Sequence, residues 1–188
     1  MATSHSISDF INGFGGGTRQ NRFKITGTIG NKANTNINGT FDKNIFYVRT
    51  ATIPNSTLGG IPINYRGRMV VYPGERVYSP WQITVLDDIP DSKNKLFEAF
   101  HDWSNNINDH AANTTSNLNP SQQFAKNDWT VEQLNTNGTA TIRKFILHHC
   151  WPQAVGDLAL DMGADNTLVS FAVNIVYSHY TIDDSPAN

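Results

Sequence analysis

Apolar and polar residues alternate with a period of two in several segments of the chain, the spacing of β-strands that bury one face. The hairpin signal Asn137-Gly138 separates two of these segments, whereas Gly59-Gly60 predicts a break and Pro73-Gly74 a turn. The alternation predicts extended segments over Arg22–Ile29, Asn44–Ile53, Ile61–Tyr72, Tyr78–Leu86, Trp129–Leu134, Thr141–Trp151 and Thr167–Ile182.

One segment has helical spacing instead. Between Lys93 and Asn108, the residues Leu96, Phe100 and Trp103 recur at intervals of three or four, with charged residues between them. About seven strands and one helix indicate a mainly β or α+β domain of the sandwich or open-barrel kind.

The chain divides into a short N-terminal part and one domain. Residues 1–21 are rich in Gly, Ser and Asn, and such a composition cannot bury enough apolar surface to fold unaided. We therefore expect a flexible arm over residues 1–21, which becomes ordered against a neighbour, and a single domain over residues 22–188. A total of 188 residues fits one domain.

Composition excludes several classes of function. The formal net charge of −2 argues against tight binding of nucleic acid, because a binder needs cations to neutralise phosphates. The chain has one cysteine, Cys150, so it forms no internal disulfide, and we expect the cytoplasm as its compartment. No run approaches the ~20 apolar residues of a membrane span, and no signal peptide is visible.

The strongest candidate for chemistry is His148-His149-Cys150. On a strand, His148 and Cys150 face one way and His149 the other, so at most two ligands converge, whereas a zinc site needs at least three. The glycines of residues 13–17 lack the Gly-Lys-Ser/Thr ending of a phosphate-binding loop. We therefore expect no catalytic, cofactor-binding or metal-binding residues.

A series of motifs resembles the tail tube proteins of contractile-tailed bacteriophages, which are related to the type VI secretion tube protein. In that family an Arg-Gly-Arg strand end, a Gly-Asp/Glu-Arg turn, a Trp strand ending in an Asn/Asp pair and a Phe-x-x-Trp helix follow in this order. The corresponding stretches here are Tyr65–Arg68, Pro73–Arg76, Trp81–Asp88 and Phe97–Trp103. The C-terminal half adds matches to the family at Phe145-Ile146, Trp151-Pro152, Val155–Asp161 and Phe171–Tyr180.

The resemblance implies a barrel-like β-sandwich with one flanking α-helix, and a structural subunit without enzymatic activity. It also implies hexameric rings stacked into a tube in the virion tail, assembled in the host cytoplasm. The implied partners are sister copies, the sheath, the baseplate and tail terminator proteins, and, in the lumen, the tape-measure protein and DNA without sequence-specific binding. No membrane partner is implied.

Two sets of residues are predicted to make the contacts between copies. The arm and the loop at Asn55–Asn64 are polar segments broken by Gly or Pro, which can become ordered on a partner. For ring stacking we expect Asn12, Phe14, Asn55, Leu58, Ile61 and Asn64, and for sheet edges between subunits we expect Phe171, Val173, Ile175 and Tyr177.

Two other functions stay open at this stage. A β-sandwich that binds carbohydrate through Trp or Tyr side chains would be a monomer or trimer with measurable affinity for sugars. A metal-dependent hydrolase that uses His148 and Cys150 would contain stoichiometric zinc and lose activity with chelators.

Overall fold

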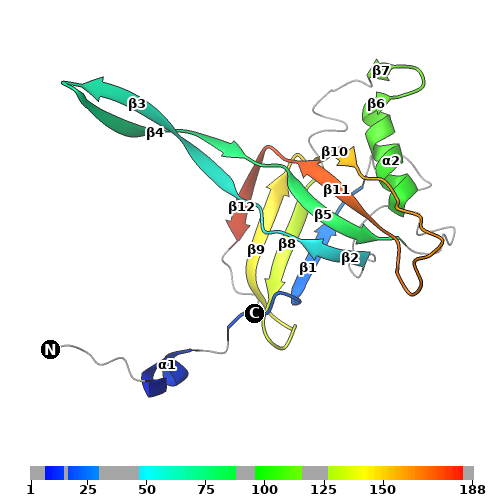
Figure 1. Ribbon diagram of the computed structural model, residues 1–188, viewed down its shortest axis with the longest axis horizontal. Coiled ribbons are helices and arrows are strands. Elements are labelled where there is room, and N and C mark those ends of the chain that lie inside the picture. Colours follow the sequence, from blue (N-terminus) through cyan, green and yellow to red (C-terminus); the bar gives the residue numbers. More distant parts are fainter. Residues whose placement is uncertain (1–6, 15–16, 30–46, 88–95, 116–126, 184–188) are drawn as a thin grey trace.

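The computed structural model describes residues 7–14, 17–29, 47–87, 96–115 and 127–183. Within these ranges the chain forms mostly β-strands, with two helices (Figure 1). The elements are α1 Ile7–Gly13, β1 Phe23–Gly27, β2 Val48–Ala51, β3 Ser56–Tyr65, β4 Arg68–Tyr78, β5 Trp81–Leu86, α2 Leu96–Ile107, β6 Asn108–Asp109, β7 Thr114–Thr115, β8 Trp129–Leu134, β9 Thr141–His148, β10 Trp151–Val155, β11 Ser170–Val176 and β12 His179–Asp183.

Two four-stranded antiparallel sheets form the body. One has the strand order β1-β8-β9-β12 and the other β10-β11-β5-β2. The sheets pack on each other, and neither is closed on itself. The prediction of a mainly β sandwich with a flanking helix is confirmed, and the structure adds that the barrel is open and that a second, short helix is present.

The core lies between the two sheets. Alternate residues of β5 and β11 point into it, and Trp81 of one sheet meets Trp129 of the other with ring centroids 6.0 Å apart. Both indole N–H groups are satisfied, since Trp81 donates to the Thr52 carbonyl and Trp129 to that of Thr28. A Cβ at Gly27 would stand 2.3 Å from the Trp129 ring, so this position requires glycine.

Helix α2 covers one end of the sandwich, as its apolar spacing predicts. Its buried residues include Phe100 and Trp103, and the Trp103 ring stacks parallel to that of Trp129 at 6.4 Å. Phe97 and Phe100 both contact Phe171 of β11 edge-on. The predicted first residues of this helix, 93–95, lie outside the described residues.

The hairpin predicted at Asn137-Gly138 is confirmed. It joins β8 to β9, the φ of Gly138 is +74°, and its N–H donates to the Asn135 carbonyl at 3.0 Å.

Two long predicted strands are each broken in the structure. Thr141–Trp151 divides into β9 and β10 at His149, whose φ of +59° ends the extended backbone. Thr167–Ile182 divides at Ser178 into β11 and β12, which belong to different sheets. Each break lets the chain cross from one sheet to the other, so the two crossings hold the sheets together.

Candidate assembly interfaces

Strands β3 and β4 form a two-stranded ribbon that projects from the body (Figure 1). With ten residues in β3, the ribbon has a length on the order of 30 Å. Its tip is a two-residue turn at Arg66 and Gly67, whose φ values of +47° and +76° match the turn that follows the natural twist of a hairpin. No sequence signal identified this hairpin.

The predicted break at Gly59-Gly60 and turn at Pro73-Gly74 are wrong. Both stretches lie inside the ribbon, opposite one another, where a bulge between Leu58 and Gly60 shifts the register. A Cβ on Gly74 would lie 3.2 Å from the Gly59 carbonyl oxygen, and one on Gly60 would lie 2.9 Å from a Val71 methyl group. The glycines therefore allow two continuous strands to approach each other closely.

A cluster of tyrosines fixes the base of the ribbon to the body. Tyr78 at the end of β4 contacts the rings of Tyr177 and Tyr180 edge-on, at 5.8 and 5.7 Å. The Tyr177 hydroxyl donates to the Asn55 carbonyl at 3.1 Å, and the Tyr180 hydroxyl lies 3.3 Å from Ser56 Oγ. Burial, followed by the neighbouring tyrosines, raises the pKa of Tyr177 to about 12. These contacts set the direction in which the ribbon leaves the sandwich.

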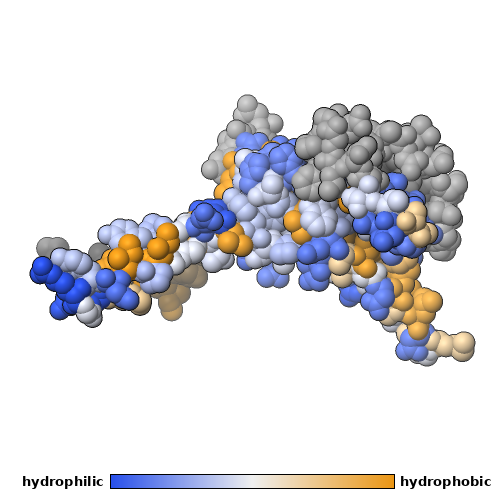
Figure 2. Space-filling view, turned by 90° about the horizontal axis from the view of Figure 1, so that it is seen from above, coloured by the Kyte–Doolittle hydropathy of each residue, from blue (hydrophilic) through white to orange (hydrophobic). Residues whose placement is uncertain are grey.

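One face of the ribbon is apolar. Ile61 pairs with Tyr72 and Ile63 with Val70, so the four side chains lie on the same side. Each of these side chains is 47–55% exposed, and Figure 2 shows hydrophobic residues along the projecting ribbon. A two-stranded hairpin alone is marginally stable in water, and an exposed apolar strip of this kind marks an interaction surface.

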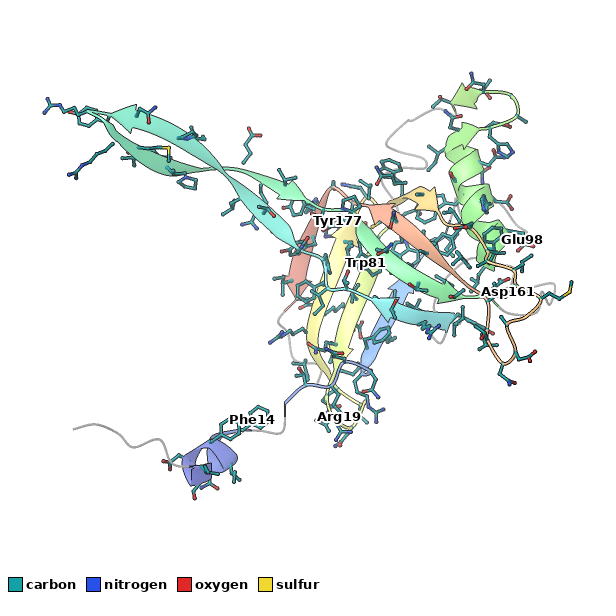
Figure 3. The ribbon with its side chains drawn as sticks, in the orientation of Figure 1. Phe14, Arg19, Trp81, Glu98, Asp161 and Tyr177 are labelled. Carbon is teal, nitrogen blue, oxygen red and sulfur yellow. The ribbon has the colours of Figure 1, made fainter. Side chains whose placement is uncertain are left out.

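The six residues predicted for ring stacking fall on two separate projections. Asn12 and Phe14 belong to the arm around α1, whereas Asn55, Leu58, Ile61 and Asn64 lie at the base of β3 or along it. Figure 3 shows Phe14 beside α1, away from the ribbon. Leu58 and Ile61 are exposed apolar residues, as a contact with another copy requires. The stacking roles stay predictions.

The residues predicted to form sheet edges between subunits do not lie on an edge strand of this chain, so that prediction is wrong. Strand β11 lies between β10 and β5 and is hydrogen-bonded on both sides. Its apolar face and the following tyrosine point into the core and are at most 5% exposed. The residues concerned are Phe171, Val173, Ile175 and Tyr177. The outer strands of the two sheets are instead β1 and β12, and β10 and β2.

Three histidines gather on the surface where the chain crosses between the sheets. The His148 ring stacks on His179 at 4.6 Å and its Nδ1 lies 3.1 Å from Asp128 Oδ2, while Ser178 Oγ is within hydrogen-bond distance of both His149 and His179. Among the described residues, no three His, Cys, Asp or Glu side chains are arranged to hold a metal ion. The cluster ties β9 to β12 through hydrogen bonds.

Cys150 lies apart from the histidines. Its side chain is fully buried, and this burial raises the thiol pKa to about 12. Only a thiolate binds zinc or attacks an electrophile, so the buried Cys150 takes no part in such chemistry with His148 and His149. The expected alternation of His148 and Cys150 on one strand face is wrong, since the strand ends at His148.

Sequence reasoning missed two features at these surfaces. The first is the apolar side of β4, including Val70 and Tyr72, whose alternation was assigned to a single strand ending at a turn. The second is α1, where Ile7, Phe10 and Ile11 have helical spacing within a segment that its glycine content marked as flexible. A search for helical periodicity inside the arm would have found it.

Comparisons with known proteins agree with this architecture. Residues 18–183 match a family model described as phage tail tube protein. A tail tube protein of Serratia phage KSP90 is 29% identical over 185 residues, which cover 98% of this chain and 99% of the relative.

Solved structures share the fold. A chain of the anti-feeding prophage baseplate, 6-fold symmetrised, superposes with a TM-score of 0.63 and 14% identity, covering 90% of this chain and 97% of that one. A chain of the PVC sheath-tube complex, an extracellular contractile injection system in the extended state, gives 0.60 and 15%, with coverage of 96% and 99%. No helix in the described part is long and apolar enough to cross a membrane.

Proposed function

Because the chain belongs to the phage tail tube protein family, we propose that it acts as a structural subunit whose copies close into hexameric rings, and that these rings stack into a hollow tail tube. The observation that carries this proposal is the β3–β4 ribbon, a long hairpin with an exposed apolar face and no core of its own. The six-fold symmetry of the similar baseplate supports a ring of six.

The ribbon is the proposed contact between copies. Laid against a neighbouring subunit, its apolar face would bury Ile61, Ile63, Val70 and Tyr72, which are each about half exposed in the single chain. Burial of such side chains is the usual driving force of association. Leu58 of the predicted stacking set would join this contact, and Asn55 would lie at its base. Asn64 pairs with Met69 and lies on the opposite face of the ribbon, so it would not take part in this contact.

The outer strands are the proposed means of ring closure. An outer strand presents a row of backbone N–H and C=O groups, and pairing with a strand of the next copy satisfies them. Strands β12 and β2 are candidates on the two sheets, in place of the core strand β11. A ring built this way would have a continuous wall of β-structure around its channel.

The remaining partners follow from the place of such a tube in a virion tail. The similar PVC complex combines a tube with a sheath, which supports a sheath partner on the outer surface. Baseplate and terminator proteins would cap the two ends, and the channel would hold the tape-measure protein and then DNA. The net charge of −2 on each subunit is compatible with a channel through which DNA slides without sequence-specific binding. Assembly would take place in the host cytoplasm.

No residue is proposed to catalyse a reaction. The residues of the core and of the tyrosine cluster serve packing. The protein would work by shape, through the contacts it makes with copies of itself.

Negative-stain electron microscopy of the purified, concentrated protein tests the proposal. We expect rings or tubes with a central pore wide enough for a DNA duplex. Compact monomers that persist at high concentration and bind sugars would contradict the proposal and favour the carbohydrate-binding alternative.

A further inference from the structure

Three imidazole rings share one small patch of surface where the chain crosses between the two sheets. His148 ends β9, His149 follows it, and His179 begins β12. The rings of His148 and His179 are stacked with their centroids 4.6 Å apart, and those of His149 and His179 lie 5.9 Å apart. Because imidazole changes its charge between pH 5 and 8, the charge of this patch depends on pH.

The hydroxyl group of Ser178 holds two of these rings. It donates its single hydrogen to the His148 carbonyl at 3.2 Å. It can therefore only accept from Nδ1 of His149 and Nδ1 of His179, at 2.7 and 3.0 Å. Both rings accordingly carry their proton on Nδ1 when neutral, and a second proton, taken up in acid, goes to Nε2.

One carboxylate balances one of the three possible positive charges. Asp128 Oδ2 lies 3.1 Å from His148 Nδ1, and the other carboxylate oxygen accepts the His149 backbone N–H. A proton on His148 is therefore offset. Further protons on His149 and His179 add like charges at short distance, and such charges repel.

The other ionisable groups on the neighbouring elements do not offset this excess, within the part of the chain that the structure describes. Lys144 and Asp183 pair with each other at 3.5 Å, at the far end of β9 and β12. Arg76, at the base of the ribbon, carries a further positive charge. The thiol of Cys150 and the phenols of the tyrosine cluster are neutral between pH 5 and 8.

The same stretch of chain holds the base of the ribbon. Ser178 and His179 lie between Tyr177 and Tyr180, two members of the tyrosine cluster. The Tyr177 hydroxyl donates to the Asn55 carbonyl, and Figure 3 shows Tyr177 where the ribbon meets the sandwich. His179 also forms the first pair of β12 with β9. A displacement of His179 would therefore move the tyrosines that set the direction of the ribbon.

We propose that His148, His149 and His179 form an acid-sensitive switch at the base of the β3–β4 ribbon. At neutral pH the patch carries little charge, and the hydrogen bonds of Ser178 hold residues 177–180 in place. In acid the charged rings repel one another, residues 177–180 loosen, and the ribbon loses the direction that contact with another copy needs. The inference rests on the tube function proposed above and adds the condition, neutral pH, under which the ribbon contact forms.

The sign of the pH dependence follows from the geometry. The repulsion exists only where the three rings are held together, so the ordered patch binds fewer protons than the loosened one. A state that binds fewer protons loses stability as the pH falls. Acid therefore weakens the base of the ribbon, and neutral pH restores it.

Assembly of the full chain at pH 7.5 and pH 5.5 tests the switch, because carboxylates stay ionised over this range whereas imidazoles change charge. The variant His149→Asn/His179→Asn keeps a side-chain N–H near each Nδ1 position and cannot become charged. Asn also tolerates the φ of +59° at position 149. The matched control His101→Asn/His110→Asn removes two exposed histidines of α2 and of the turn after β6.

We expect the protein concentration needed for assembly, measured by sedimentation, to rise about fivefold at pH 5.5 in the native protein and in the control. In His149→Asn/His179→Asn it should rise less than twofold. A native protein that assembles equally well at both pH values would overturn the switch. The same rise in His149→Asn/His179→Asn as in the native protein would overturn it too.

Hydrogen exchange of the unassembled chain separates the switch from the tube function. After correction for the intrinsic pH dependence of exchange, protection of residues 177–183 should fall about fivefold at pH 5.5 in the native protein and stay unchanged in His149→Asn/His179→Asn. This loss of protection without rings at either pH would refute only the tube function. Unchanged protection in the native protein would refute the switch, whether or not tubes form.

Discussion

The apolar face of the ribbon allows a quantitative prediction for the double variant Ile61→Thr/Ile63→Thr. Both side chains are about half exposed in the single chain, at 52% and 49%. Full burial of an Ile side chain contributes about 2 kcal/mol, so the half still exposed is worth about 1 kcal/mol per residue on assembly. The double variant should lose about 2 kcal/mol per contact, which corresponds to an assembly concentration about 30-fold higher.

Threonine keeps the β-branched shape that strands favour, so the hairpin itself should form as before. The control Ile61→Val/Ile63→Val removes one methylene from each side chain and should raise the assembly concentration only about fourfold. The assay is sedimentation of assembled protein over a dilution series, with thermal unfolding of the unassembled chain followed by circular dichroism. A double Thr variant that assembles at the normal concentration, or that loses assembly only because its unfolding temperature falls, would refute the reasoning.

Three further predictions concern the body of the subunit. Gly27→Ala should lower the free energy of unfolding by about 2 kcal/mol because its Cβ would overlap the Trp129 ring. The control Gly13→Ala should not lower it, since no atom lies near that position. Equal denaturation midpoints for the two variants would count against this packing. The Cys150 thiol should resist maleimide at pH 8 in the folded protein and react after denaturation, since its pKa is about 12, and rapid labelling of the folded protein would contradict this burial. Folding raises the Tyr177 pKa from 10 to about 12, so the neutral phenol stabilises the fold below pH 10. This contribution to the free energy of unfolding is lost as the pH rises toward 12. Tyrosinate absorbance and unfolding titrations should show the loss of stability in the native protein and a smaller loss in Tyr177→Phe.

Local patterns predicted the elements in which one face is buried throughout. Trp81, Ile83 and Val85 alternate into the core, and Leu96, Phe100 and Trp103 form the buried stripe of α2, so both elements follow from period and type of residue. The Asn137-Gly138 turn followed from the backbone conformation that glycine permits.

The breaks between sheets could not be predicted in this way. Tyr177 continues the apolar alternation of β11 and is itself buried, so nothing in the pattern marks the change of sheet at Ser178. For the same reason the alternation of Phe171 and Val173 showed a buried face but not whether the strand is central or outer. Strand order depends on contacts between distant segments, which a single sequence does not display.

The ribbon was misread because its glycines have a tertiary role. Gly59 and Gly74 face each other across two strands, and only the pairing of these strands shows why both positions need a small residue. The turn at Arg66-Gly67 lacks the usual Asn or Asp before its glycine. The candidate residues Leu58 and Ile61 were assigned to a loop, and the structure places them on an exposed strand.

Cryo-electron microscopy of the assembled protein tests the central claim most directly, by showing where the β3–β4 ribbon lies. We predict a hollow tube of stacked rings in which the ribbon of each subunit rests on a neighbouring copy and covers Ile61, Ile63, Val70 and Tyr72. A particle in which these side chains face solvent, or in which the ribbon folds back on its own sandwich, would contradict the account.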